Sequence, residues 1–191
     1  MKARELALTA MLCLGVVAAP MTQAQDAPRL NRKIEQVMLL NQILPVLFTR
    51  EQLQAILPAI EGARQAEQKL SAEELKVLRR NETKMDTAIA AGRKQHRIPS
   101  NDEMAPIKSM ISSLSMARRA LVISQSDKVR VAMQKVCNRG QIKAAANSFD
   151  PRWFDRTLDP EKMSEDEKLR LFVQLVLLDP EAYPLLVDLS R

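Results

Sequence analysis

The chain has 191 residues, a net charge of +6 and 46% hydrophobic residues, enough for one domain with a buried core. It contains four glycines, two cysteines and one histidine. These counts argue against a disulfide framework, a glycine-rich phosphate loop and a paired-histidine metal site.

Residues 1–24 have the features of a secretory signal peptide. Lys2 and Arg4 precede an apolar run from Leu6 to Ala19, which is too short to span a bilayer comfortably. Small residues follow and predict cleavage after Ala24. We therefore expect an exported, periplasmic protein, with a retained signal anchor as the alternative.

The next segment predicts a helix with an unusually wide apolar arc. Residues 25–30 resemble a disordered leader, and the helix is expected to begin at Asn31. One face carries Ile34, Val37, Met38, Asn41 and Leu44, and the arc is widened by Leu39, Leu40, Ile43 and Leu47. The helix is therefore either central to the core or packed against a second subunit. Pro45 should bend or end it.

The stretch from Phe48 to Leu53 predicts a well-defined helix start. The Thr49 hydroxyl can accept a hydrogen bond from the Gln52 backbone N–H, while the Gln52 side chain reaches back to the Thr49 N–H. Phe48 and Leu53 can close around this capping box as a hydrophobic staple.

A looser form of the same pattern occurs at Leu70, Ser71 and Glu74. It offers a second cap inside the apolar repeat that runs from Leu53 to Ile89. The segment 50–92 is therefore either one long bent helix or two helices that meet near Ser71. We favour the long bent helix.

A second long helix is predicted from another capping box, formed by Ser100 and Glu103. Its expected buried stripe contains Ile107, Met110, Ile111, Leu114, Ala117 and Leu121, and the pattern continues to Cys137. Two such helices joined by a short basic turn predict an antiparallel αα-hairpin. Cys137, the one cysteine outside the predicted signal peptide, lies on the apolar stripe and is expected to be buried.

The remaining residues predict shorter helices. Trp153 and Phe154 are expected to anchor this tail on the hairpin, and Ser164 should cap a helix over 165–178. No segment alternates as a strand would. We predict an all-α fold: long bent helices forming an antiparallel αα-hairpin domain over residues 25–148, with an additional C-terminal cluster of short helices over residues 149–191.

The charges are unevenly distributed. Residues 76–143 contain 15 Lys and Arg against 5 Asp and Glu, whereas residues 155–181 contain 4 against 8. This basic region indicates an anionic partner, a basic body neutralised by its own acidic tail, or simply solvated helix faces. For an exported protein, an anionic envelope surface or an acidic unfolded chain fits better as the partner than nucleic acid does.

Catalytic patterns are absent from the sequence. The single histidine, His96, lies among cations in a basic turn, and the acidic pairs fall in the first turns of helices, where they complement the helix dipole. We therefore predict no enzymatic activity, no cofactor and no metal site.

Methionines on the second helix suggest a binding surface instead. Methionine adapts its shape readily and is common on surfaces that accept varied partners. Candidate binding residues are Met110, Met116, Arg118, Arg119, Lys128 and Arg130. Met116 lies off the predicted stripe and should be exposed, although core packing is the commoner role of methionine at helical spacing.

The residues at 48–52, Phe-Thr-Arg-Glu-Gln, resemble the motif of the periplasmic LTXXQ proteins, which include the Spy and CpxP chaperone and stress proteins. Phe48 replaces the motif's leucine, while Thr49 and Gln52 match. The likeness covers roughly residues 34–137. It implies a small helical protein, often a cradle-shaped antiparallel dimer, that binds unfolded polypeptide without ATP.

Together these patterns favour an exported, ATP-independent protein that holds unfolded or stress-damaged polypeptide. The alternative is a non-catalytic envelope scaffold that mates with one fixed partner or with itself, or that binds an anionic envelope surface through its basic region.

Overall fold

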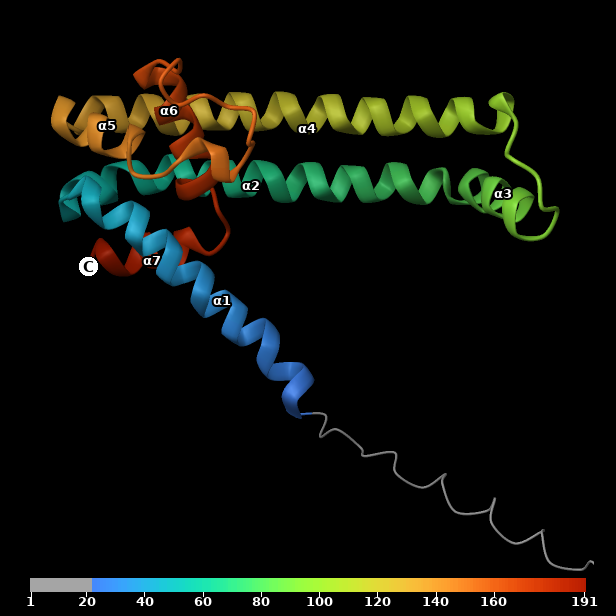
Figure 1. The fold of residues 1–191 in the computed structure, drawn as a ribbon, viewed down its shortest axis with the longest axis horizontal. Coiled ribbons are helices and arrows are strands. Elements are labelled where there is room, and N and C mark those ends of the chain that lie inside the picture. Colours follow the sequence, from blue (N-terminus) through green and yellow to red (C-terminus); the bar gives the residue numbers. More distant parts are fainter. Residues whose placement is uncertain (1–21) are drawn as a thin grey trace, which may run out of the picture. The chain divides into compact units, whose positions relative to one another are not determined.

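A computed structural model describes residues 22–191, with side chains from residue 28 onward. The predicted signal peptide lies outside the described residues as far as position 21. The described part of the chain divides into two units between Glu35 and Gln36. Every regular element in residues 22–191 is helical, which confirms the all-α prediction (Figure 1).

The first helix, α1 (Thr22–Ile43), spans the division between the two units. It begins earlier than Asn31, so the prediction of a disordered leader over 25–30 is wrong within the described residues. Alanine and glutamine between 23 and 27 have high helix propensity, and Pro28 is accommodated inside the helix. The helix ends before Pro45, which lies in the short 3-10 turn η1 (Leu44–Val46).

Two long helices form the framework of the second unit. α2 (Arg50–Arg80) and α4 (Asn101–Val136) lie side by side and run in opposite directions (Figure 1). They are connected by α3 (Glu82–Arg93) and a turn in which Arg97 forms an ion pair with Glu103. Residues 124–127 do not interrupt α4. The Ser126 hydroxyl forms hydrogen bonds to the Val122 and Ile123 carbonyls of the preceding turn and so satisfies its donor within the helix.

The C-terminal elements pack against one end of this pair. They are α5 (Arg139–Ala146), the 3-10 turn η2 (Pro151–Trp153), α6 (Glu165–Phe172), the π-helical turn η3 (Val173–Leu177) and α7 (Ala182–Leu189). Their buried side chains share one core with α1, α2 and α4. Phe172 is the largest fully buried side chain of that core.

The middle of the α2–α4 pair is packed much more loosely. Between Ala63 and Ala88 no apolar side chain is fully buried, and the same is true of α4 between Met110 and Val129. Beyond this stretch a second, smaller cluster forms around Ala88, Ile107 and Met110. The helical pair is therefore held by apolar packing at its two ends.

Trp153 and Phe154 do not anchor the tail. Their side chains are 77% and 63% exposed, so the predicted role is wrong. Phe172 and the partly buried Phe149 supply the aromatic packing that the two exposed residues were expected to provide. In η2 the buried side chain is Pro151, and the three residues that follow it, Arg152, Trp153 and Phe154, are exposed.

Candidate functional site

Two capping boxes meet at the end of the α2–α4 pair that the C-terminal elements cover. At the start of α2, Gln52 N donates to Thr49 Oγ1 at 3.2 Å, and Thr49 N donates to Gln52 Oε1 at 2.9 Å. At the start of α5, Asn138 and Gln141 form the same box, with both bonds at 3.0 Å. Each helix start therefore satisfies its own exposed backbone N–H groups.

The two glutamine side chains also bind each other. Gln52 Nε2 donates to Gln141 Oε1 at 2.9 Å, and Gln141 Nε2 donates to Gln52 Oε1 at 2.8 Å. The second proton of each amide goes to a backbone carbonyl: Gln52 donates to Val136 O and Gln141 to Leu47 O. All donors and acceptors of both amides are thus used.

This glutamine pair connects three chain segments that are far apart in the sequence. It joins the loop before α2, the C-terminal end of α4 and the start of α5. Gln141 is buried, and Leu47 is held in the left-handed backbone region with φ of 55°. The arrangement contains no nucleophile or general base, so its chemistry is structural.

The second box was absent from the sequence-based predictions. The signal that identifies it is the Asn-x-x-Gln spacing, because asparagine caps helices as well as serine or threonine does.

The looser capping motif at Ser71 does not form a cap, so at this position the helix continues, as in the favoured alternative of one long helix. Ser71 is an exposed residue inside α2, which continues unbroken to Arg80 and is divided from α3 at Asn81 instead. Glu74 does not reach back to Ser71 but pairs with Arg118 of α4. Leu70 lines a groove between the helices. The local motif fails here because the preceding turns are already helical and leave no free N–H groups to cap.

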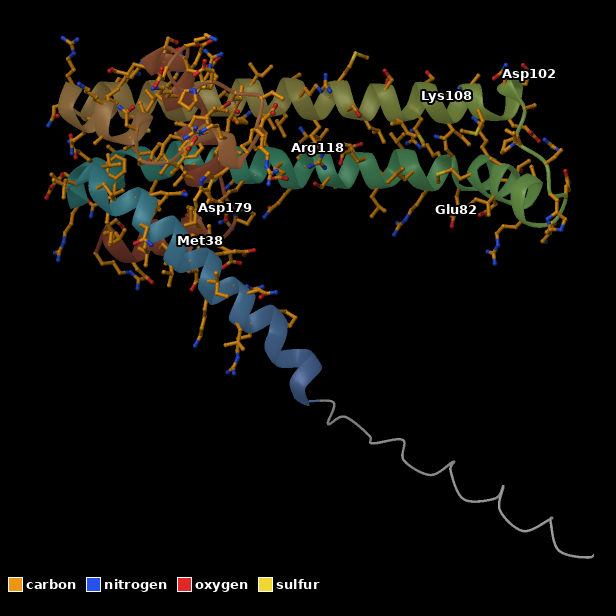
Figure 2. The ribbon with its side chains drawn as sticks, in the orientation of Figure 1. Met38, Glu82, Asp102, Lys108, Arg118 and Asp179 are labelled. Carbon is orange, nitrogen blue, oxygen red and sulfur yellow. The ribbon has the colours of Figure 1, made fainter. Side chains whose placement is uncertain are left out.

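The candidate binding residues of α4 are not gathered on one surface. Met110 is buried in the small second cluster, whereas Met116 is 62% exposed as expected. Arg118 pairs with Glu67 and Glu74, in the gap between α2 and α4 (Figure 2).

Arg130 is also engaged within the fold, and two of the remaining candidates face solvent. The Arg130 guanidinium contacts Asp127 at 3.4 Å and Asp166 of α6 at 2.7 Å. Arg119 and Lys128 are exposed. Two of the four cations predicted to contact a client, Arg118 and Arg130, therefore form ion pairs that connect α4 to other helices.

One face of the α2–α4 pair continues past its covered end as an exposed apolar surface. On α4, Ser126 and Val129 are covered by the C-terminal elements, and Gln174 Nε2 donates to Ser126 Oγ at 3.1 Å. Steps of three and four residues keep side chains on one face of a helix, and they lead from Ser126 along α4 to Val122, Arg118, Ser115 and Ile111. Val122 and Ile111 are exposed, which corrects the predicted burial of Ile111.

The matching line on α2 behaves in the same way. Arg64 stacks on the ring of Tyr183 from α7, with 4.2 Å from the guanidinium carbon to the ring centroid. The line continues through Ser71 to Leu75 and Leu78, both exposed. We call Leu75, Leu78, Ile111 and Val122, with Arg118 among them, the open strip. A recess of about 410 Å³ lies where the open strip meets the covered end of the pair. Its lining includes Ser71, Leu178 and Pro180.

The opposite face of the pair contains a groove of about 580 Å³. Leu70 and Val77 of α2 and Met110 and Leu114 of α4 supply its apolar lining, with Glu73 and Lys84 among its polar residues.

Cys137, the C-cap residue that follows Val136 at the end of α4, is partly buried. Burial raises the pKa of the thiol to about 11, because the thiolate is poorly solvated there. At neutral pH the group is therefore protonated and a weak nucleophile.

Comparisons of this chain with models of protein families, with curated proteins and with solved structures find no match. Among the described residues, no helix combines the length and apolar character that crossing a bilayer requires. No three His, Cys, Asp or Glu side chains within that same part of the chain come together as a metal-binding group.

Proposed function

We propose that the protein is an exported, ATP-independent binding protein that holds unfolded polypeptide on the open strip. The observation that carries this proposal is the continuation of a core-forming face into solvent. The same lines of residues that the C-terminal elements bury at one end of α2 and α4 carry exposed Leu, Ile and Val further along. Contiguous exposed apolar surface is a feature of interaction sites.

The chemistry of the strip suits varied apolar segments. Aliphatic side chains on two neighbouring helices bind without directional demands, as a holder of unrelated clients requires. By helical spacing, Arg79 of α2 and Lys108 and Arg119 of α4 border the strip (Figure 2 labels Lys108). These cations would attract acidic residues of a client that is bound on the strip. The loosely packed middle of the pair gives these helices room to adjust to a client.

The resemblance to LTXXQ proteins is consistent with this proposal. Gln52 of the motif is hydrogen-bonded to Gln141, the last residue of the Asn-x-x-Gln capping box of α5. The motif therefore acts by fixing the helix starts, while the strip provides the contact surface.

The strip predicts which substitutions abolish holding activity. The triple variant Leu75→Ser, Ile111→Ser and Val122→Ser is expected to reduce suppression of client aggregation about tenfold, because it removes exposed apolar area without opening the core. The measurement is light scattering of several unrelated denatured proteins at stoichiometric amounts, without nucleotide. Met116→Ser with Ile123→Ser, on the outer face of α4, is the matched control and should keep full activity.

Two results would contradict the proposal. One is the absence of protection for every client tested with the unaltered protein. The other is equal activity in the strip variant and the control, which would show that the strip is not the contact surface.

A second candidate function, binding to an anionic envelope surface, is favoured by the turn after α3. Ile98 is 91% exposed, the highest value among the large apolar side chains described. Arg93 and Lys94 precede it, and no acidic residue occurs between 87 and 101. An apolar side chain among cations is the arrangement that inserts into an anionic lipid interface.

This candidate predicts binding that depends on salt. Vesicles containing phosphatidylglycerol should retain the protein at low ionic strength and release most of it at about 0.5 M salt, because counterions screen the attraction. Ile98→Ser with Lys94→Gln should weaken the binding several-fold in a sedimentation assay. Retention that is equal on neutral vesicles, or unaffected by salt, would exclude it.

A further inference from the structure

An exposed tryptophan borders a small recess between the last turns of α1 and the segment that joins α5 to η2. The recess has a volume of about 260 Å³, and its lining includes Trp153, Phe149 and Met38 (Figure 2 labels Met38). All of its lining residues belong to the second unit. Trp153 is the single tryptophan of the chain, and its side chain is 77% exposed. A flat indole beside a recess offers a contact surface for a ring-shaped ligand.

The local backbone holds Trp153 in place before any ligand binds. Pro151 begins η2 and is buried, and Asp150 caps the turn by accepting a hydrogen bond from Arg152 N at 3.0 Å. Trp153 N donates to Asp150 O, also at 3.0 Å. Phe149, which lines the recess as well, packs against the main core. Because these contacts fix the segment, filling the recess costs little conformational entropy.

Two amides of α1 offer hydrogen bonds to a ligand. Asn41 and Gln42 line the recess, and within the part of the chain that the structure describes neither side chain has a hydrogen-bond partner. Each amide supplies two donor hydrogens and one acceptor oxygen. The Ser148 hydroxyl donates to Ala145 O at 3.0 Å, so its oxygen can still accept a hydrogen bond. A ligand in the recess therefore meets both donors and acceptors.

The recess has no uncompensated charge. Asp150 is the one ionisable residue in its lining, and Arg152 Nε donates to both carboxylate oxygens at 2.9 Å. These hydrogen bonds also lower the pKa of Asp150, so the pair stays ionised. A cationic ligand would compete with Arg152, and an anionic one would be repelled by the carboxylate. A purely aliphatic ligand would leave the Asn41 and Gln42 amides without water or a partner.

We propose that this recess binds one uncharged pyranose ring of an oligosaccharide, stacked on Trp153. The C–H groups on one face of a pyranose lie against the electron-rich face of an indole. Its hydroxyls donate and accept hydrogen bonds, as the amides of Asn41 and Gln42 do. Pockets for drug-sized ligands measure roughly 300–1,000 Å³, so this smaller recess takes a single ring. The inference is independent of the proposed client-binding function.

A saccharide fits the recess better than a polypeptide segment does. An extended peptide pairs its backbone with the edge of a sheet, and a helical peptide lies in a long apolar groove. Residues 22–191 contain no strand. The recess is compact, and four of its seven lining side chains are polar.

The test uses the emission of the chain's single tryptophan. Protein expressed from the complete chain is titrated with three uncharged tetrasaccharides: tetra-N-acetylchitotetraose, cellotetraose and maltotetraose. At least one of them should shift the emission of Trp153 to shorter wavelength, because the stacked ring displaces water from the indole. The dissociation constant should be on the order of 1 mM, as expected for one weakly held ring. The sugar that binds identifies the preferred pyranose.

Substitutions at the recess should weaken this binding. Trp153→Ala should raise the dissociation constant at least tenfold, measured by titration calorimetry because this variant has no tryptophan. Asn41→Ala with Gln42→Ala should raise it several-fold in the emission assay. Phe154→Ala is the matched control, since Phe154 is an exposed aromatic residue outside the recess lining, and it should leave the constant unchanged. Circular dichroism checks that each variant remains helical.

Saturating sugar should leave the suppression of client aggregation unchanged, because the recess and the open strip share no residue. Three results would overturn the proposal. The first is the absence of an emission shift with all three sugars at about 10 mM, tenfold above the expected constant. The second is a dissociation constant that Trp153→Ala does not change. The third is an emission shift with a denatured client protein but with no sugar, which would assign Trp153 to polypeptide binding.

Discussion

Replacing Phe172 with alanine is expected to lower the free energy of unfolding by about 4 kcal/mol. Phe172 is fully buried where α6 meets the core shared by α1, α2 and α4. Phenylalanine-to-alanine changes in cores cost about 3–5 kcal/mol, through lost apolar burial and the cavity that remains. For a chain of this length the midpoint of thermal unfolding should fall by about 10 °C.

Phe154 provides the matched control, since it allows the same chemical change at an exposed position. Phe154→Ala should alter the free energy of unfolding by less than about 0.5 kcal/mol. Urea unfolding followed by circular dichroism compares the two at one protein concentration, because any dimer would make stability concentration-dependent. A cost below 1 kcal/mol for Phe172→Ala would show that the C-terminal helices do not belong to the cooperative core.

Replacing Gln52 with alanine is expected to cost about 3 kcal/mol. The change removes the cap of α2, typically about 1 kcal/mol, and leaves Val136 O without its side-chain donor. It also removes one donor and one acceptor partner of the buried Gln141 amide, which keeps its bonds to Leu47 O and Asn138 N. Gln141→Ala should cost a similar amount for the same reason. The double variant should cost clearly less than the two together, with a coupling energy of about 1–2 kcal/mol.

Gln65→Ala is the control for this cycle. Gln65 is also a glutamine of α2, but it is exposed and donates only to Glu61 on its own helix, so its loss should be nearly neutral. Strictly additive effects of Gln52→Ala and Gln141→Ala would contradict a direct amide pair. Gln52→Glu offers a further check, because its carboxylate cannot donate to Val136 O and should destabilise the protein more at pH 7 than at pH 4.

The two capping patterns of α2 show how far local sequence reasoning reaches. Thr49-x-x-Gln52 and Ser71-x-x-Glu74 obey the same rule, yet only the first forms a cap. Pro45 and the left-handed backbone of Leu47 interrupt the helix before Thr49. The first N–H groups of α2 therefore lack partners within the helix and can be capped by side chains. Ser71 follows five helical turns and meets no such break, and Glu74 has a better partner in Arg118.

The binding surface illustrates the opposite case. Helical periodicity correctly placed Ile107 inside and Met116 outside, but it assigned Ile111 to the core and Trp153 and Phe154 to packing roles. Each side chain is apolar enough to be buried. Whether it is buried depends on how far α6, η3 and α7 extend along α2 and α4, which no local pattern encodes.

The sequence by itself determined the all-α class, the starts of α2, α4 and α6, and the end of α1 before Pro45. These follow from interactions between residues three or four positions apart, which any helix of this sequence contains. Only the tertiary structure decided the Gln52–Gln141 pair, the ion pairs of Arg118 and Arg130, and the exposed apolar residues of the open strip. More than 30 positions separate the partners in the Gln52–Gln141 pair, in Arg118–Glu74 and in Arg130–Asp166, and each contact depends on which helices pack together.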